Sequence, residues 1–145
     1  DELDAKDQSG GMDANTLAWD FWYRGDGGGL PGSNGAVSLA LSPMGAYEDA
    51  LLYSDRTSAS DEKYRGFGTA AMLARADAIN AAAMWLAAGA LVAPEDCFRP
   101  TGTTSTRTLC RLSSGLDSDA ASDWHIVPTK GATPGAVNSD EVYVP

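Results

Sequence analysis

Only one stretch of this chain, residues 69–88, has the spacing of an amphipathic helix. Its apolar residues recur at intervals of four and three, which places them on one helical face: Met72, Ala76, Ile79, Ala83 and Leu86. The stretch is rich in alanine, the best helix former. Thr69 suits an N-cap and Gly89 suits the residue after the last turn. We therefore expect a single Ala-rich helix over 69–88 that packs against a sheet.

The remainder of the chain has the alternation of short β-strands. The clearest case, 36–42, places Val37, Leu39 and Leu41 on one side and small residues on the other. The 16 glycines gather between such segments, as a fold with many turns requires. The next strand, 47–54, follows a Pro-Met-Gly turn, so the two should form a hairpin. The predicted strands are 17–23, 36–42, 47–54, 103–112, 124–127 and 142–144.

Length and charge bound the number of domains and the kinds of partner. The 145 residues suit one domain, which we place at 16–145 behind a mobile acidic lead-in at 1–15. The net charge is −10, which argues against nucleic acid and anionic membrane surfaces as partners. The most apolar stretch, 81–93, is shorter than the ~20 residues of a membrane-spanning helix, so no membrane span is expected.

Two cysteines, Cys97 and Cys110, are separated by twelve residues. Two cysteines in a chain rich in Gly, Ser and Thr, which starts at Asp1 rather than methionine, favour one disulfide in a secreted or cell-surface protein. Two buried free thiols are the alternative. A zinc site is disfavoured, because the chain has no C-x-x-C pair and a single histidine.

An aspartate-rich segment, Asp117-Ser-Asp-Ala-Ala-Ser-Asp123, is the one candidate metal site. Asp117, Asp119 and Asp123 stand at positions 1, 3 and 7, and closely spaced carboxylates of this kind can bind Ca²⁺. The glycine and glutamate of an EF-hand loop are missing from positions 6 and 12, where Ser122 and Pro128 stand. The alternative, which we favour, is that these carboxylates accept hydrogen bonds from local backbone N–H groups.

Asp20, Trp22 and Tyr23 form a candidate surface for a ligand or partner. Asp20 and Trp22 share a face of the 17–23 strand, and exposed aromatic rings beside polar groups are typical of sugar-binding or protein-binding surfaces. The alternative is that the aromatic rings of this strand fill the core. The only histidine, His125, is expected to face solvent from a strand, and no motif gives it a nucleophile. We therefore predict no catalytic residues, no enzyme activity and no cofactor other than calcium.

Three motifs follow one another in the second half of the chain: Leu-Cys-Arg-Leu112, an acid-rich turn that ends in Asp-Trp124, and a closing Thr-Pro-Gly-Ala-Val-Asn138. In this order they resemble the C-terminal portion of the lamin-tail domain of secreted bacterial proteins. The stretch from Gly35 to Tyr53 also resembles the middle hairpin of that family, so the resemblance covers residues 35–138.

The resemblance implies a mostly β, immunoglobulin-like sandwich into which the helix of 69–88 is inserted. It also implies a non-catalytic interaction or structural module in a secreted or cell-surface protein, with a protein or carbohydrate partner or with further copies of itself. The alternative is a small secreted hydrolase, or a carbohydrate-binding accessory domain that uses its aspartates and exposed aromatic rings.

Overall fold

The structure, a computed structural model, describes residues 31–42, 45–58, 63–104, 107–128 and 137–144. Within these residues most of the regular structure is strand, in small antiparallel sheets, with one α-helix. The predicted β-rich fold with a single helix agrees with this. In chain order the elements are β1 (Asn34–Ala40), β2 (Tyr47–Ser54), α1 (Ala70–Ala81), a 3₁₀ turn η1 (Pro94–Asp96), β3 (Leu109–Arg111), a 3₁₀ turn η2 (Ala121–Asp123) and β4 (Trp124–Ile126).

Strands β1 and β2 form the predicted hairpin. They pair antiparallel from Asn34 opposite Ser54 to Ala40 opposite Tyr47, with one irregularity after Leu39. The bounds of β2 are those that the sequence predicts, whereas β1 lies two residues earlier than expected. The outer edge of β2 is occupied by Phe98, which exchanges backbone hydrogen bonds of 2.9 Å with this strand at each side of Tyr53.

Helix α1 begins where the sequence predicts and ends seven residues too early. The hydroxyl of Thr69 accepts the backbone N–H of Met72 at 3.1 Å, as an N-cap does. The helix stops because Ala83 adopts a left-handed backbone (φ 60°). The N–H of Met84 then bonds to the carbonyl of Ile79 at 3.1 Å, which closes a Schellman motif. The predicted end at Ala88, just before Gly89, was wrong, because sequence patterns do not show an alanine in the left-handed region.

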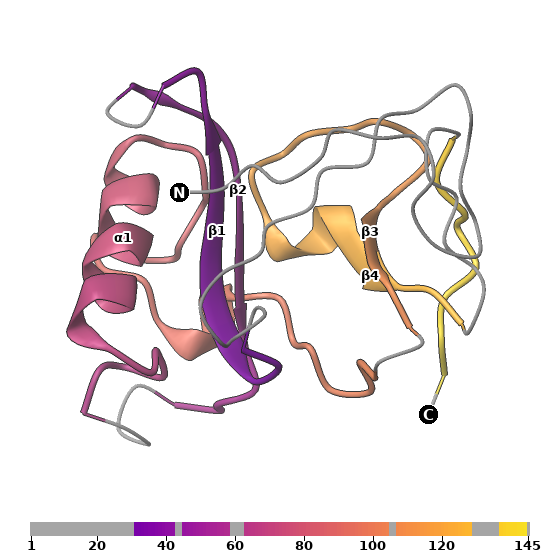
Figure 1. Cartoon of the computed structure of the whole chain (residues 1–145), viewed down its shortest axis with the longest axis horizontal. Coiled ribbons are helices and arrows are strands. Elements are labelled where there is room, and N and C mark those ends of the chain that lie inside the picture. Colours follow the sequence, from indigo (N-terminus) through magenta and orange to yellow (C-terminus); the bar gives the residue numbers. More distant parts are fainter. Residues whose placement is uncertain (1–30, 43–44, 59–62, 105–106, 129–136, 145) are drawn as a thin grey trace.

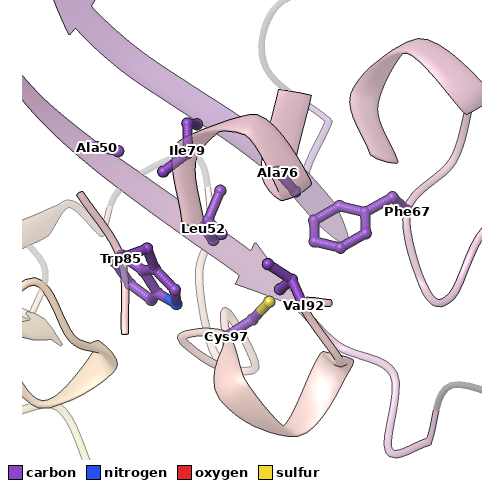
Figure 2. Close-up of a cluster of buried hydrophobic side chains, with 8 residues drawn as sticks. All are labelled: Ala50, Leu52, Phe67, Ala76, Ile79, Trp85, Val92 and Cys97. Carbon is purple, nitrogen blue, oxygen red and sulfur yellow. The ribbon is translucent and has the colours of Figure 1, made fainter. Parts of the chain in front are cut away.

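The helix and the inner face of the hairpin enclose the main core (Figure 2). The helix contributes Ala76 and Ile79, both inaccessible to solvent. Trp85, just beyond the helix, is also fully buried. The core residues are Ala50, Leu52, Phe67, Ala76, Ile79, Trp85, Val92 and Cys97.

The second, smaller sheet joins β3 and β4 through three residue pairs, from Leu109 opposite Ile126 to Arg111 opposite Trp124. Residues 137–144 run alongside this sheet without forming a strand, so the prediction of an edge strand at 142–144 was wrong. A single backbone bond, from the N–H of Tyr143 to the carbonyl of Ile126 at 2.8 Å, ties this segment to β4.

The hairpin lies between the other two parts of the molecule (Figure 1). Helix α1 covers one of its faces, and η2 with the β3–β4 sheet lies on the opposite side. Because α1 packs on the side of Ala36, Ala50 and Leu52, the larger side chains of β1 face the other way. No helix in the described part of the chain is long and apolar enough to cross a membrane.

Candidate functional site

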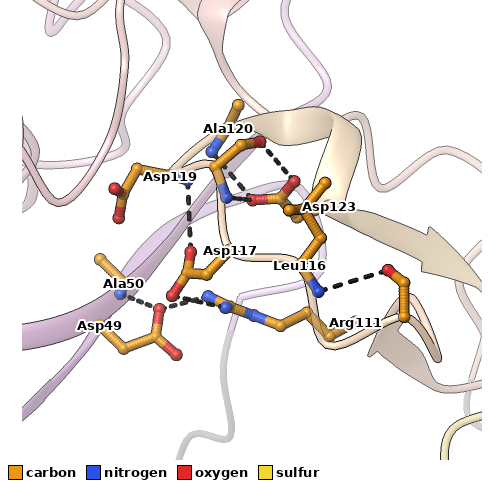
Figure 3. A network of polar contacts seen from close by, with 10 residues as sticks. Asp49, Ala50, Arg111, Leu116, Asp117, Asp119, Ala120 and Asp123 are labelled. Carbon is orange, nitrogen blue, oxygen red and sulfur yellow. Dashed lines mark hydrogen bonds and ion pairs between the residues drawn. The ribbon is translucent and has the colours of Figure 1, made fainter.

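The segment between β3 and β4 is organised by the buried carboxylate of Asp123, which is only 3% exposed. It accepts the backbone N–H of Ser118 at 2.8 Å, the backbone N–H of Ala120 at 3.3 Å and the hydroxyl of Ser118 at 2.5 Å (Figure 3). Burial alone would raise the pKa of Asp123, but these hydrogen bonds outweigh it and lower the pKa. Asp123 therefore acts as the local backbone acceptor that the sequence allowed.

Arg111 binds another aspartate of this segment, Asp117. Its guanidinium lies 2.7 Å from the carboxylate of Asp117 and 2.5 Å from that of Asp49 on β2, and it stacks on the ring of Trp124 at 5.0 Å. Burial lowers the pKa of Arg111, yet the hydrogen bond to Asp117 and the charges of both aspartates raise it on balance. Arg111 thus connects the hairpin to the β3–β4 half of the molecule.

The three aspartates of the candidate calcium site, Asp117, Asp119 and Asp123, have separate roles. Asp123 is occupied by backbone donors and Asp117 by Arg111, while Asp119 has a left-handed backbone (φ 54°). Burial first, and then the nearby charge of Asp117, raise the pKa of Asp119. In the residues that the structure describes, no group of three His, Cys, Asp or Glu side chains is arranged to hold a metal ion.

His125 is buried, which corrects the expectation of a solvent-facing histidine. It is 5% exposed, and its Nε2 lies 2.6 Å from the carbonyl of Ser139. That contact secures residues 137–144 against β4, together with a 2.8 Å bond from the amide of Asn138 to the carbonyl of Arg111. Its role in the described structure is to hold this segment in place.

The two cysteines are free thiols in this structure, so the predicted disulfide is not formed. Cys97 lies in the main core and donates to the carbonyl of Ala93 at 3.5 Å. Cys110 lies in β3, opposite His125. Burial, with the nearby charges of Asp96 and Glu95, raises the pKa of Cys97 to about 12, and burial also raises that of Cys110. The alternative of two buried thiols fits this arrangement.

An apolar and mostly exposed segment follows α1, and we call residues 81–91 the apolar loop. No side chain from Ala78 to Pro94 is ionisable. Most of the loop is exposed, including Leu86 at 62% and Leu91 at 61%, although Trp85 within it is buried. An exposed apolar surface on an acidic protein is typical of a contact with another protein.

Polar side chains outside the apolar loop fix its backbone. Asn80 accepts the N–H of Ala87 at 3.2 Å and donates to the carbonyls of Gly89 and Ala90 at 3.2 and 3.3 Å. Asp96 accepts the N–H of Ala88 at 2.9 Å and, through its own carbonyl, the indole N–H of Trp85 at 3.0 Å. The apolar surface is therefore held in one conformation before any partner arrives.

A cavity of about 420 Å³ lies on the opposite face of the hairpin from α1. Apolar side chains from both halves of the molecule line much of it, among them Val37, Leu39, Leu51, Tyr53, Leu109 and Trp124. The hydroxyl of Tyr53 donates to the carbonyl of Pro31 at 2.8 Å. Pro31, the first described residue, also lines the cavity.

Asp20, Trp22 and Tyr23, the predicted partner surface, lie outside the described residues, as does the lead-in at 1–15. Sequence reasoning missed Arg111 and Asp49, which are 62 positions apart and carry no shared motif. It also missed Asn80, for which one signal exists: it is the only polar side chain between Asp77 and Glu95. A lone amide in such a run is a candidate for binding nearby backbone groups.

The fold and these surfaces define a small β-rich domain with one helix and an exposed apolar loop. The family model TP_1001_2nd, described as "protein second domain", matches residues 1–126. The chain therefore belongs to this family. Neither a curated protein nor a solved structure matches the chain.

Proposed function

We propose that this domain is a non-catalytic interaction module that associates with a second copy of itself through the apolar loop, residues 81–91. The observation that carries the proposal is the exposure of Leu86 and Leu91 on a loop whose backbone is fixed by Asn80 and Asp96. A fixed loop loses little conformational entropy on binding, so more of the burial energy contributes to affinity.

The apolar loop is the place where charge opposes a second copy least. Two chains that each carry a net charge of −10 repel one another at most orientations. The apolar loop has no ionisable side chain, so two copies can meet there without opposing carboxylates within the contact. A contact of eleven residues per chain is small, and we expect weak association, at roughly 10–100 μM.

The lamin-tail resemblance supports the same class of function, since it implies an interaction or structural module. The immunoglobulin-like sandwich and the secreted or cell-surface location belong to this proposal as well. The description "second domain" of the matched family suits a module that works within a longer protein.

The test is light scattering coupled to size exclusion over a range of protein concentrations. We expect the average mass to rise with concentration for the native chain, and to stay that of a monomer for the variant L86Q/L91Q. The control is L116Q, because Leu116 has nearly the same exposure, 63%, but lies outside the apolar loop. A native chain that stays monomeric at about 500 μM, or an equal effect of L116Q, would overturn the proposal.

A further inference from the structure

The cavity on the outer face of the hairpin lacks a packing partner in the described structure. Its volume is about 420 Å³, which is ample for several side chains or water molecules. Much of its lining is hydrocarbon and aromatic, so water is a poor occupant. An apolar group is therefore expected to fill it.

The hairpin directs its larger side chains toward this cavity. Val37 and Leu39 of β1 line it, and Leu39 is 64% exposed. Their neighbour Ala36 packs on the opposite face, against the main core. A strand that places its small residues in the core and its large ones outside is typical of a sheet with a second covered face.

The first residues that the structure describes lie at the cavity. Pro31 and Gly32 line it, and Tyr53 fixes the carbonyl of Pro31. Seven residues, four of them glycine, separate Tyr23 from Pro31, and they can span at most roughly 25 Å. Residues 17–23 are therefore tethered within reach of the cavity at a high effective concentration.

The chemistry of residues 17–23 suits the cavity. Leu17, Trp19, Phe21 and Tyr23 alternate with smaller or polar residues, which gives an extended strand one apolar face. The indole Nε1–H of Trp124, which lines the cavity, is buried and has no acceptor among the described residues. A peptide strand carries backbone carbonyls that can accept this bond, whereas a hydrocarbon ligand cannot.

We propose that residues 17–23 of the same chain dock as an extended strand over the outer face of the β1–β2 hairpin, with Trp19 and Phe21 filling the cavity between the hairpin and Trp124. The family match is consistent with this, because residues 1–126 include both the segment and the elements that form the cavity. The inference is independent of the apolar loop, since no residue of 81–91 lines the cavity.

Cysteine cross-linking in the full chain tests the docking. Leu39→Cys is combined with Trp19→Cys or Phe21→Cys, and mild oxidation is followed by peptide mapping. We expect a disulfide within the monomer for at least one pair. The native thiols are buried, and the pKa of Cys97 is about 12, so they compete little for the cross-link. The matched controls combine Leu39→Cys with Asp20→Cys or Trp22→Cys, whose side chains should point away, and these should cross-link at least tenfold more slowly.

Three outcomes would overturn the proposal. They are equal cross-linking at the even and odd positions, no cross-link at any position, or cross-links only between two chains, which would place the segment of one copy on another. Hydrogen exchange of the unmodified chain gives a second measurement. The amides of 17–23 should be protected in the native chain and lose that protection in W19A/F21A but not in W22A. Unprotected amides in the native chain would contradict docking.

Discussion

Ala83 shows how one backbone conformation limits the length of a helix. Its left-handed φ of 60° ends α1 and turns the chain so that Trp85 enters the core. An alanine in this conformation costs about 1–2 kcal/mol that a glycine does not. The local strain is accepted because the turn buries the largest ring of the core.

Ala83→Gly should therefore stabilise the protein. Relief of the left-handed strain outweighs the greater flexibility of an unfolded glycine, so we expect a net gain of about 0.5–1 kcal/mol and a rise in Tm of about 2 °C. Thermal unfolding followed by circular dichroism measures this. The control is Ala82→Gly, since Ala82 has an ordinary φ of −83°, and it should lose about 0.5–1 kcal/mol. A loss in both variants would contradict the explanation.

At the scale of elements, the turn between β3 and β4 depends on one buried carboxylate. Asp123 binds the backbone of Ser118 and Ala120, so it gives the turn its shape. Asp119, in the same turn, has its pKa raised by burial and by Asp117, whereas that of Asp123 is lowered. Two neighbouring aspartates should therefore affect stability in opposite directions.

Asp123→Asn should destabilise the protein by about 1–3 kcal/mol at neutral pH, because buried backbone donors lose their charged acceptor. Since folding lowers the pKa of Asp123, its contribution is present above the ordinary value of 3.8 and is lost as the pH falls through the lower folded value. Urea unfolding between about pH 6 and pH 3 should show a shallower acid loss in this variant than in the native chain.

Asp119→Asn provides the control for that experiment. Folding raises the pKa of Asp119, so its charged form disfavours the fold above the ordinary value of 3.8. Asparagine also tolerates the left-handed backbone at this position. This variant should be as stable as the native chain or slightly more stable at neutral pH. If it lost as much stability as Asp123→Asn, the opposite roles of the two carboxylates would be disproved.

At the scale of the whole molecule, Arg111 adds an ionic link between the hairpin and the β3–β4 side, where Ala121 and Trp124 also pack against the main core. The main core lies between α1 and the hairpin, whereas Arg111 belongs to β3 on the other side. Its ion pair with Asp49 of β2 spans the two parts. The side chain of Asp49 is 34% exposed, so solvent screening reduces the strength of this pair.

A double-mutant cycle measures this link. We expect Arg111→Met and Asp49→Asn to show a coupling of about 0.5–1 kcal/mol in urea unfolding, which decreases as salt is added. Glu48→Gln, on the same strand but outside this ion pair, should show coupling to Arg111→Met below about 0.3 kcal/mol. Equal coupling for both carboxylates would mean that Arg111 senses only the overall acidity of the chain.

Local sequence patterns were sufficient to predict the features that depend on residues close together in the sequence. Alternation and turn residues gave the β1–β2 hairpin, and the hydroxyl of Thr69 gave the start of α1, because strand faces and helix caps are formed by neighbours in the sequence. The favoured prediction for Asp123, that its carboxylate accepts hydrogen bonds from nearby backbone N–H groups, is also a local one, and the structure shows these bonds from Ser118 and Ala120.

Only the tertiary structure decided the features that depend on distant residues. The end of α1 at Ala81 follows from the burial of Trp85, which the helical period of 69–88 could not show. His125 is buried because residues 137–144 pack across β4, and the thiols of Cys97 and Cys110 belong to different parts of the fold. Arg111 meets Asp49 across 62 positions of sequence. Such contacts form only when the whole chain packs, because the residues involved are far apart in the sequence and no interaction between sequence neighbours favours them.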